Sequence, residues 1–169
     1  MLEFILFIIC ESIIFIFIFF YISTVFFGSP FYPSSINSVK RMIKLAEPKK
    51  NDLILDVGSG DGRIVYMLAK LGYTVHGIEI NLFFVIFANL LLFFTRNHKN
   101  ARVYWANMWK YDMSKYNVIF CYLLPGTLDK LVEKFTKELK PATKIISNTF
   151  KISNWKPVKQ EDKVYVYKI

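Results

Sequence analysis

Cysteine and histidine are scarce in this sequence of 169 residues, which contains two of each. Cys10 lies in an apolar leader and Cys121 in a predicted buried strand, so no disulfide framework is available. His76 and His98 lack the spacing of metal ligands, and we expect no metal site. This cysteine usage fits a reducing compartment.

Charge is nearly missing from the first 39 residues, which hold two acidic residues and no basic one. The remainder carries 22 basic and 11 acidic residues, a net charge of +11. No stripe of Lys or Arg interleaved with aromatic residues stands out, so we expect no nucleic-acid partner. A basic domain beside an apolar leader is more simply explained by attraction to anionic lipid headgroups.

The longest apolar run, Phe4 to Phe27, contains Glu11 as its one charged residue. As a helix it would extend about 36 Å, enough for a tilted bilayer crossing. Because it lacks the flanks of a signal peptide, we predict a single-pass membrane anchor in residues 1–30. Basic residues after the run place the domain of residues 31–169 on the cytoplasmic, or matrix, side. Glu11 either has a function within the membrane or snorkels to the interface.

Beyond the leader, short apolar runs alternate with helical patterns. The predicted strands are 53–57, 74–80, 102–106, 118–123, 143–148 and 163–169, and the predicted helices are 36–46, 64–71, 82–94 and 127–139. Strands that alternate with helices indicate an α/β fold, with a Rossmann-like doubly wound, mostly parallel sheet.

The predicted helix at Leu82 to Phe94 is apolar except for Asn89, and it is too short to span a bilayer. Its apolar residues are more than one packed face needs. Two interpretations stay open: a helix buried on the sheet with an apolar outer side, or a helix docked on a membrane surface.

A glycine-rich turn follows the first predicted strand, and Gly58, Gly60 and Gly62 in it would let the backbone approach a ligand closely. In a doubly wound sheet the ligand lies beyond the carboxyl ends of the strands. Glu79 ends the second strand there, and its carboxylate is a suitable acceptor for the hydroxyls of a ribose.

Two residues of the turn argue against a dinucleotide. Arg63 stands where the dinucleotide fingerprint has its third glycine. Asp61 would repel a pyrophosphate but would suit a ligand that bears an amino group and a sulfonium. A ligand with a ribose and no pyrophosphate therefore fits better.

Several short segments resemble motifs of one enzyme class, the seven-strand S-adenosylmethionine-dependent methyltransferases. They are Phe31-Tyr32-Pro33-Ser34, Leu55 to Gly62, Gly60 to Ile64, Glu79-Ile80-Asn81, Leu123-Leu124-Pro125 and Trp155-Lys156-Pro157. Together they look like the small protein-lysine methyltransferases of archaea and mitochondria, and the resemblance covers roughly residues 32–169. The mitochondrial members carry a similar N-terminal membrane segment and modify lysines of inner-membrane proteins.

The resemblance implies S-adenosylmethionine as cofactor and assigns roles in holding it. Gly58 and Gly60 would contact the methionine part, Glu79 the ribose, and Asn107 with Met108 the adenine. The remaining residues of the predicted cofactor site are Asp56, Ser59, Asp61 and Gly62. The two aspartates would orient the loop and the cofactor rather than catalyse.

The predicted acceptor side of the site is aromatic. Tyr32, Tyr122, Phe150 and Trp155 lie near predicted strand ends or in the matching motifs. Their rings would discourage the ammonium form of a lysine by desolvation and offer π faces to cations. Each is equally well explained as an ordinary core residue, and no residue stands out as a general base.

The sequence thus predicts a membrane-anchored methyltransferase that acts on lysine ε-amines of membrane proteins. A small-molecule methyltransferase for a lipid or quinone is one alternative, and a catalytically silent S-adenosylmethionine-binding scaffold is another. The acceptor lysine, the number of methyl groups and the oligomeric state are left open.

Overall fold

The computed structural model describes residues 2–27 and 32–169, and the chain separates into two units, residues 1–31 and 32–169. The first unit contains helix α1 (Leu2–Phe27). The two prolines in Gly28–Ser35 predict a short stiff linker, and residues 28–31 of it lie outside the described residues. Within them, no helix is both long and apolar enough to cross a membrane. The transmembrane anchor predicted for the leader is therefore unsupported.

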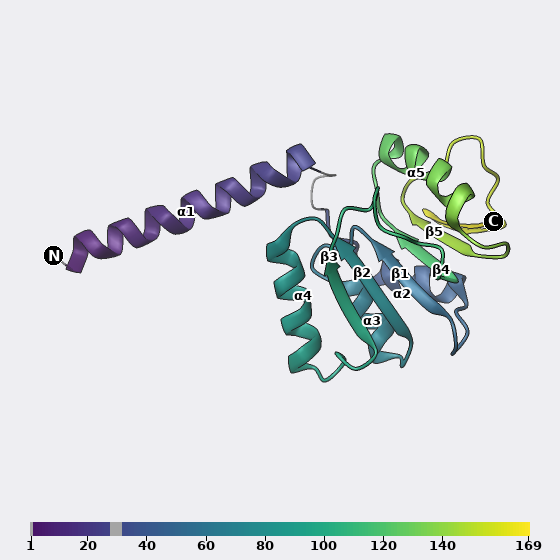
Figure 1. Cartoon of the computed structure of the whole chain (residues 1–169), viewed down its shortest axis with the longest axis horizontal. Coiled ribbons are helices and arrows are strands. Elements are labelled where there is room, and N and C mark those ends of the chain that lie inside the picture. Colours follow the sequence, from purple (N-terminus) through teal and green to yellow (C-terminus); the bar gives the residue numbers. More distant parts are fainter. Residues whose placement is uncertain (1, 28–31) are drawn as a thin grey trace. The chain divides into compact units, whose positions relative to one another are not determined.

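The second unit is built on one sheet of seven strands in the order β3-β2-β1-β4-β5-β7-β6 (Figure 1). Their bounds are β1 Leu53–Val57, β2 Thr74–Glu79, β3 Ala101–Trp105, β4 Val118–Cys121, β5 Lys144–Asn148, β6 Lys159–Glu161 and β7 Val164–Lys168. Strands β1 to β5 pair in parallel, whereas β7 runs antiparallel to both β5 and β6. The predicted α/β, mostly parallel sheet is confirmed, but β6 was not predicted.

Helices cover both faces of this sheet. They are α2 (Ile36–Ala46), α3 (Arg63–Lys70), α4 (Leu82–Phe94) and α5 (Pro125–Glu138). Buried residues of α2, α3 and α4 form one core with one face of the strands, while α5 forms a second core with the other face. The continuous apolar runs of β1 and β4 are explained by this burial on both sides.

Helix α4 covers the edge strand β3 (Figure 1). Its one polar residue, Asn89, donates from Nδ2 to the Val103 carbonyl oxygen at 2.8 Å and accepts from the Val103 N–H at 3.1 Å. These bonds satisfy backbone groups that an edge strand leaves unpaired. Val85, Ala88 and Leu92 bury the same side of α4, so Asn89 fixes which side of the helix faces the sheet.

Two glycines bring the elements around the first turn into close contact. A Cβ atom on Gly62, which has φ +78°, would lie 2.6 Å from Cβ of Ala88 in α4. A Cβ on Gly77 in β2 would lie 2.7 Å from Oγ of Ser59. Both separations are far below van der Waals contact, so only glycine lets the turn pack against α4 and β2 in this way.

Candidate active site

The glycine-rich turn between β1 and α3 folds back onto the end of β2. The backbone N–H groups of Gly58 and Ser59 both donate to the Ile78 carbonyl oxygen, at 2.9 and 3.0 Å. Gly58 and Gly60 adopt positive φ values of 72° and 52°, which a residue with a Cβ rarely adopts. The turn is therefore held at the carboxyl edge of the sheet with its backbone close to β2.

The carboxylate of Glu79 hydrogen-bonds the turn to the end of β2. Its Oε2 accepts from the Gly60 N–H at 2.9 Å, and its Oε1 accepts from the N–H groups of Ile80 and Asn81 at 2.8 and 2.9 Å. A carboxylate offers about four acceptor positions, so roughly one remains, on Oε2. Glu79 thus joins three backbone donors and keeps capacity for a further hydroxyl donor.

Asp56, at the end of β1, is 2% exposed. Burial raises the pKa of its carboxyl to about 8, and the nearby carboxylates of Glu79 and Asp61 act in the same direction. Among the described residues, Asp56 Oδ2 and Ser59 Oγ are buried side-chain atoms without a hydrogen-bond partner. Buried polar atoms are normally bonded, so two orphaned ones beside a glycine turn are expected where a ligand supplies the partners.

Asp61 pairs with a side chain at the start of α3, an arrangement that fits its predicted role in orienting the loop. Its carboxylate accepts from the Arg63 side chain through Nε at 3.0 Å and Nη2 at 2.6 Å, and Arg63 Nη1 donates to the Ser34 carbonyl oxygen at 2.6 Å. The charge of Asp61 is therefore paired with that of Arg63 in the structure. Arg63 joins the turn to the segment before α2, a function that its place in the sequence did not reveal.

Three of the four predicted aromatic residues come together at the same edge. Tyr122 follows β4 and stacks on Phe150, which follows β5, with ring centroids 6.2 Å apart. Tyr32, before α2, meets the Tyr122 ring edge-on at 6.1 Å and is 75% exposed. The segment that carries Tyr122 adjoins the turn, because a Cβ on Gly58 would lie 3.3 Å from Cδ2 of the next residue, Leu123.

Asn148 hydrogen-bonds to the segment that carries Tyr32. It ends β5, is buried, and donates from Nδ2 to Ser34 Oγ at 3.1 Å while Ser38 Oγ donates to its Oδ1 at 2.6 Å. The segment that carries Tyr32 is thereby joined to β5. A polar residue at the end of a buried strand is the one sequence signal for Asn148, and it does not reveal these partners.

Trp155 contacts a ring outside the group formed by Tyr32, Tyr122 and Phe150. Its indole contacts Tyr167 of β7 at a centroid distance of 5.7 Å and packs against the core on the α5 side. No described ring contact joins it to Tyr32, Tyr122 or Phe150. Its placement fits the alternative interpretation, an ordinary core residue.

Asn107 and Met108 follow β3, two strands from β1. Asn107 Oδ1 accepts from the Trp109 N–H at 2.9 Å, and the Asn107 carbonyl oxygen accepts from the N–H groups of Lys110 and Tyr111. Asn107 therefore organises a local turn, and Met108 packs partly buried against the core. Both residues lie at the carboxyl edge of the sheet, beyond Glu79 of β2.

The site combines backbone donors, carboxyl groups and aromatic rings, which can bind and align a ligand. Among the residues that the structure describes, no cluster of three potential metal ligands is found. Burial raises the pKa of the Cys121 thiol to about 12, so this residue stays protonated and unreactive near neutral pH. The site thus contains a turn rich in backbone donors, the carboxyl groups of Asp56 and Glu79, and the rings of Tyr32, Tyr122 and Phe150. We call these three rings the aromatic wall.

The chain is similar in sequence to a known methyltransferase family and to several of its members. The family model described as the ANTKMT methyltransferase domain matches residues 56–159. A protein-lysine N-methyltransferase of Saccharolobus islandicus is 33% identical over 153 residues, which cover 83% of this chain and 93% of that protein. A Xenopus laevis lysine N-methyltransferase, named for the C-subunit of ATP synthase, is 30% identical over 128 residues, 76% of this chain.

The chain spans only about half, 56%, of the Xenopus protein. Among solved structures, an RNA methyltransferase of Salinibacter ruber in complex with S-adenosyl-L-homocysteine is 30% identical and superposes with a TM-score of 0.79. That match covers 82% of this chain and 94% of the Salinibacter chain. The sheet is therefore that of a seven-strand methyltransferase.

Asp56→Asn should change how the stability of the ligand-free protein depends on pH. The folded carboxyl keeps its proton up to about pH 8, whereas an unfolded aspartate loses it near pH 4. The folded state therefore binds more protons between these values, and the free energy of unfolding of the wild type should fall as pH rises through them, by roughly 2 to 4 kcal/mol.

Urea denaturation at a series of pH values measures this effect, and the fall should be absent in Asp56→Asn. Asp129→Asn is the control, because hydrogen bonds from Ser153 lower the pKa of the exposed Asp129 carboxyl. Equal pH slopes for wild type and Asp56→Asn would contradict a buried, protonated Asp56.

Proposed function

The chain belongs to the family of the ANTKMT methyltransferase domain, and from this premise we propose that it transfers methyl groups from S-adenosylmethionine to lysine ε-amines of a protein. The observation that carries the proposal is the Saccharolobus relative, because the chain covers 93% of a protein named for that activity. The geometry of the turn supports the cofactor, and the aromatic wall supports the acceptor.

The residues present fit S-adenosylmethionine. The orphaned Asp56 Oδ2 and Ser59 Oγ suit a polar, cationic group beside the glycine turn, and the remaining acceptor position of Glu79 suits a ribose hydroxyl. Asn107 and Met108, at the carboxyl edge of the sheet beyond Glu79, would contact the adenine, as the resemblance implies. When bound, the cofactor would supply a methyl group on a sulfonium, which a neutral amine can displace.

The chain must make the lysine nucleophile available. A lysine side chain has an ordinary pKa of about 10.4, so its neutral form costs roughly 4 to 5 kcal/mol near pH 7. Tyr32, Tyr122 and Phe150 would lower that cost by excluding water from around the ammonium. Their ring faces also accept the methylated, positively charged product.

Alignment is the main catalytic contribution that these residues can make. Displacement at a sulfonium requires the attacking nitrogen in line with the leaving sulfur. Holding the two groups in that geometry lowers the entropic part of the activation barrier. Water can take the proton that the amine releases, which agrees with a site that has no evident general base. The Arg63 and Asn148 contacts help alignment, since Arg63 joins the Tyr32 segment to the turn and Asn148 joins it to β5.

We propose that the acceptor is a lysine of a membrane protein. Two relatives are lysine N-methyltransferases, one named for the C-subunit of ATP synthase and one for the adenine nucleotide translocase. We further propose that the leader keeps the catalytic domain at a membrane, on its cytoplasmic or matrix side. The apolar composition of Phe4 to Phe27 supports this association, whereas the bilayer crossing itself has no structural support.

RNA is the second candidate acceptor, favoured by the Salinibacter relative, which is named an RNA methyltransferase. Against it, the Tyr32, Tyr122 and Phe150 rings offer π faces to an alkylammonium. Labelling distinguishes the two acceptors directly.

Glu79→Gln should weaken S-adenosylmethionine binding at least tenfold, because an amide NH2 in place of one oxygen would face a backbone donor and remove charge-assisted hydrogen bonds worth about 1.5–3 kcal/mol. Calorimetry with the full chain measures the dissociation constant. Glu133→Gln, the same change on the exposed side of α5, should bind like wild type. Unchanged binding by Glu79→Gln, or binding of NAD alone, would sink the assigned cofactor site.

Tyr122→Ala should lower kcat for lysine methylation by roughly tenfold or more while cofactor affinity stays within about twofold, because its ring aligns the acceptor. Tyr122→Phe keeps the ring and should retain most activity. The assay follows labelled methyl groups into membrane fractions, followed by acid hydrolysis to identify methyl-lysine. Label confined to RNA or to the lipid extract would refute the proposed acceptor, and cofactor binding without any transfer would indicate a silent scaffold.

The membrane location is tested by fractionation of cells that express the full chain. The chain should sediment with membranes and stay there through a high-salt wash, because apolar burial is insensitive to salt. Ile9→Lys combined with Ile13→Lys should release it. The control Ile36→Lys with Val158→Lys adds the same charge to exposed positions of the catalytic domain. A wild-type chain found in the soluble fraction would refute membrane association.

A further inference from the structure

The outer side of α4 is a continuous apolar surface. Ile86, Phe87, Leu90, Phe93 and Phe94 are each about half exposed or more, with Phe94 at 77%. The helix has no charged residue in its 13 positions. A helix that is apolar all round is normally buried on all sides or in contact with lipid. The sheet covers only one side of α4.

The packing of α4 on the sheet does not account for this outer surface. Val85, Ala88 and Leu92 supply the buried contacts, and the Asn89 amide fixes the orientation of the helix through Val103. Polar residues at Ile86 or Leu90 would leave those contacts unchanged. The outer apolar side chains therefore need a separate explanation.

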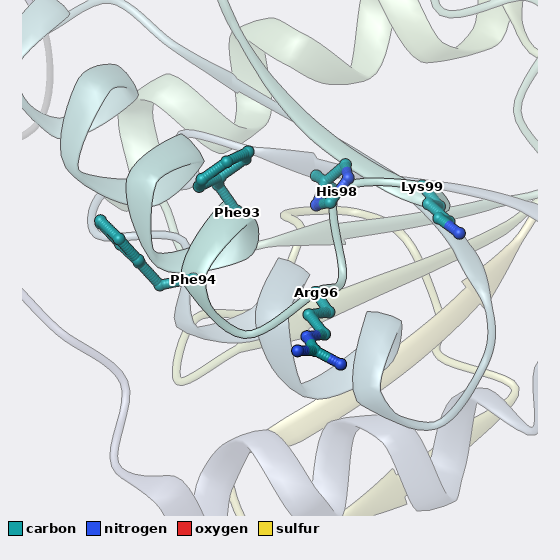
Figure 2. Close-up of a pocket in the computed structure, with 5 residues that line it drawn as sticks. All are labelled: Phe93, Phe94, Arg96, His98 and Lys99. Atoms are coloured by element: carbon teal, nitrogen blue, oxygen red, sulfur yellow. The ribbon is translucent and has the colours of Figure 1, made fainter.

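Cationic side chains follow directly at the end of the helix. A pocket of about 480 Å³ is lined by Phe93 and Phe94 from the last turn of α4 and by Arg96, His98 and Lys99 from the loop after it (Figure 2). Arg96 has φ 60°, in the left-handed region, and it ends the helix there. Aromatic rings and basic side chains thus share one surface.

Carboxylates are absent from this part of the sequence. Residues 80–111 contain no Asp or Glu, but they contain four basic residues, Arg96, Lys99, Arg102 and Lys110. A second copy of the chain on α4 would bring two carboxylate-free basic surfaces together, which like-charge repulsion opposes. The fitting partner is apolar in its interior and negatively charged at its border.

We propose that the outer side of α4 docks on the surface of an anionic lipid bilayer. The helix is about 20 Å long and lies along the surface, with its apolar residues among the upper acyl chains. Arg96 and Lys99 meet lipid phosphates at one end. At the other end Trp105, 66% exposed, donates from Nε1 to the Ile80 carbonyl oxygen, and tryptophan favours the headgroup region.

The docking also has a consequence for the candidate active site. Trp105 and Glu79 are register partners at the ends of β3 and β2, so a bilayer at α4 lies next to the edge of the sheet that carries the glycine turn. The surface itself is independent of the proposed methyl transfer and needs no cofactor.

A fluorescent probe at a single position tests contact by α4 itself. In a Cys10→Ser background, Leu90→Cys carries an environment-sensitive label on the full chain, and Val158→Cys carries it beside β6 at the opposite edge of the sheet. With phosphatidylcholine–phosphatidylglycerol vesicles, the label at position 90 should shift to shorter wavelength and be quenched by nitroxide lipids. The label at position 158 should do neither.

The cationic end is tested by Arg96→Gln combined with Lys99→Gln. Each basic residue near an anionic surface contributes about 1 kcal/mol, so the label at position 90 should need roughly tenfold or more additional vesicle for the same shift. The control Lys163→Gln with Lys168→Gln removes the same charge near β7 and should have little effect. Vesicles of phosphatidylcholine alone should bind weakly in every case.

Several results would overturn the proposal. One is a chain that sediments with vesicles while the label at position 90 stays in water, since another segment then makes the contact. Another is a shift that depends on protein concentration without vesicles, which indicates self-association. A third is an equal loss of vesicle binding in the Arg96→Gln, Lys99→Gln variant and in its Lys163→Gln, Lys168→Gln control. Cofactor binding by each labelled chain, measured separately, confirms that the catalytic domain is folded.

Discussion

The candidate site depends on one carboxylate, that of Glu79, and on the three backbone N–H groups that it accepts. The Gly58 and Ser59 N–H groups of the glycine turn are accepted by the Ile78 carbonyl oxygen, and the Gly60 N–H, at a residue with positive φ, is accepted by Glu79 and would lose this partner without it. Glu79 lies at the end of β2, whose position is set by pairing with β1 and β3 on either side. The central sheet therefore determines the shape of the turn, and the remaining acceptor position of Glu79 is presented in a fixed direction.

A second set of contacts joins the segment before α2 to this turn. Arg63 reaches the Ser34 carbonyl oxygen while it pairs with Asp61, and Asn148 bonds to Ser34 and Ser38. The segment that carries Tyr32 is consequently joined at two points, one on the turn and one on β5. A wall built from three separate segments keeps its shape only when such cross-connections exist, since the stacked rings alone contribute about a kilocalorie per mole each.

The sequence predicted the parts of this site that depend on local pattern. The apolar run into Gly58 indicated a strand and a turn, and Glu79 was found because the fold places the end of β2 opposite that turn. The pairing of Asp61 with Arg63 depends on how the turn places two side chains, and the sequence pattern indicated only that Arg63 replaces a fingerprint glycine. Asn148 and Ser34 are 114 residues apart, and such contacts leave no local signal. Strand β6 was missed because its three residues, Lys-Gln-Glu, contain no apolar residue.

The Asn89 amide has a consequence for the behaviour of the protein in concentrated solution. The unpaired backbone groups of an edge strand can pair with a strand of another molecule, which extends the sheet. Such pairing is a common first step of aggregation, and β3 is an edge strand. By occupying the N–H and C=O of Val103, Asn89 blocks that template from the side where α4 lies. One amide side chain therefore leaves the apolar side chains of α4 exposed while it occupies the backbone groups of Val103 through which another strand would pair.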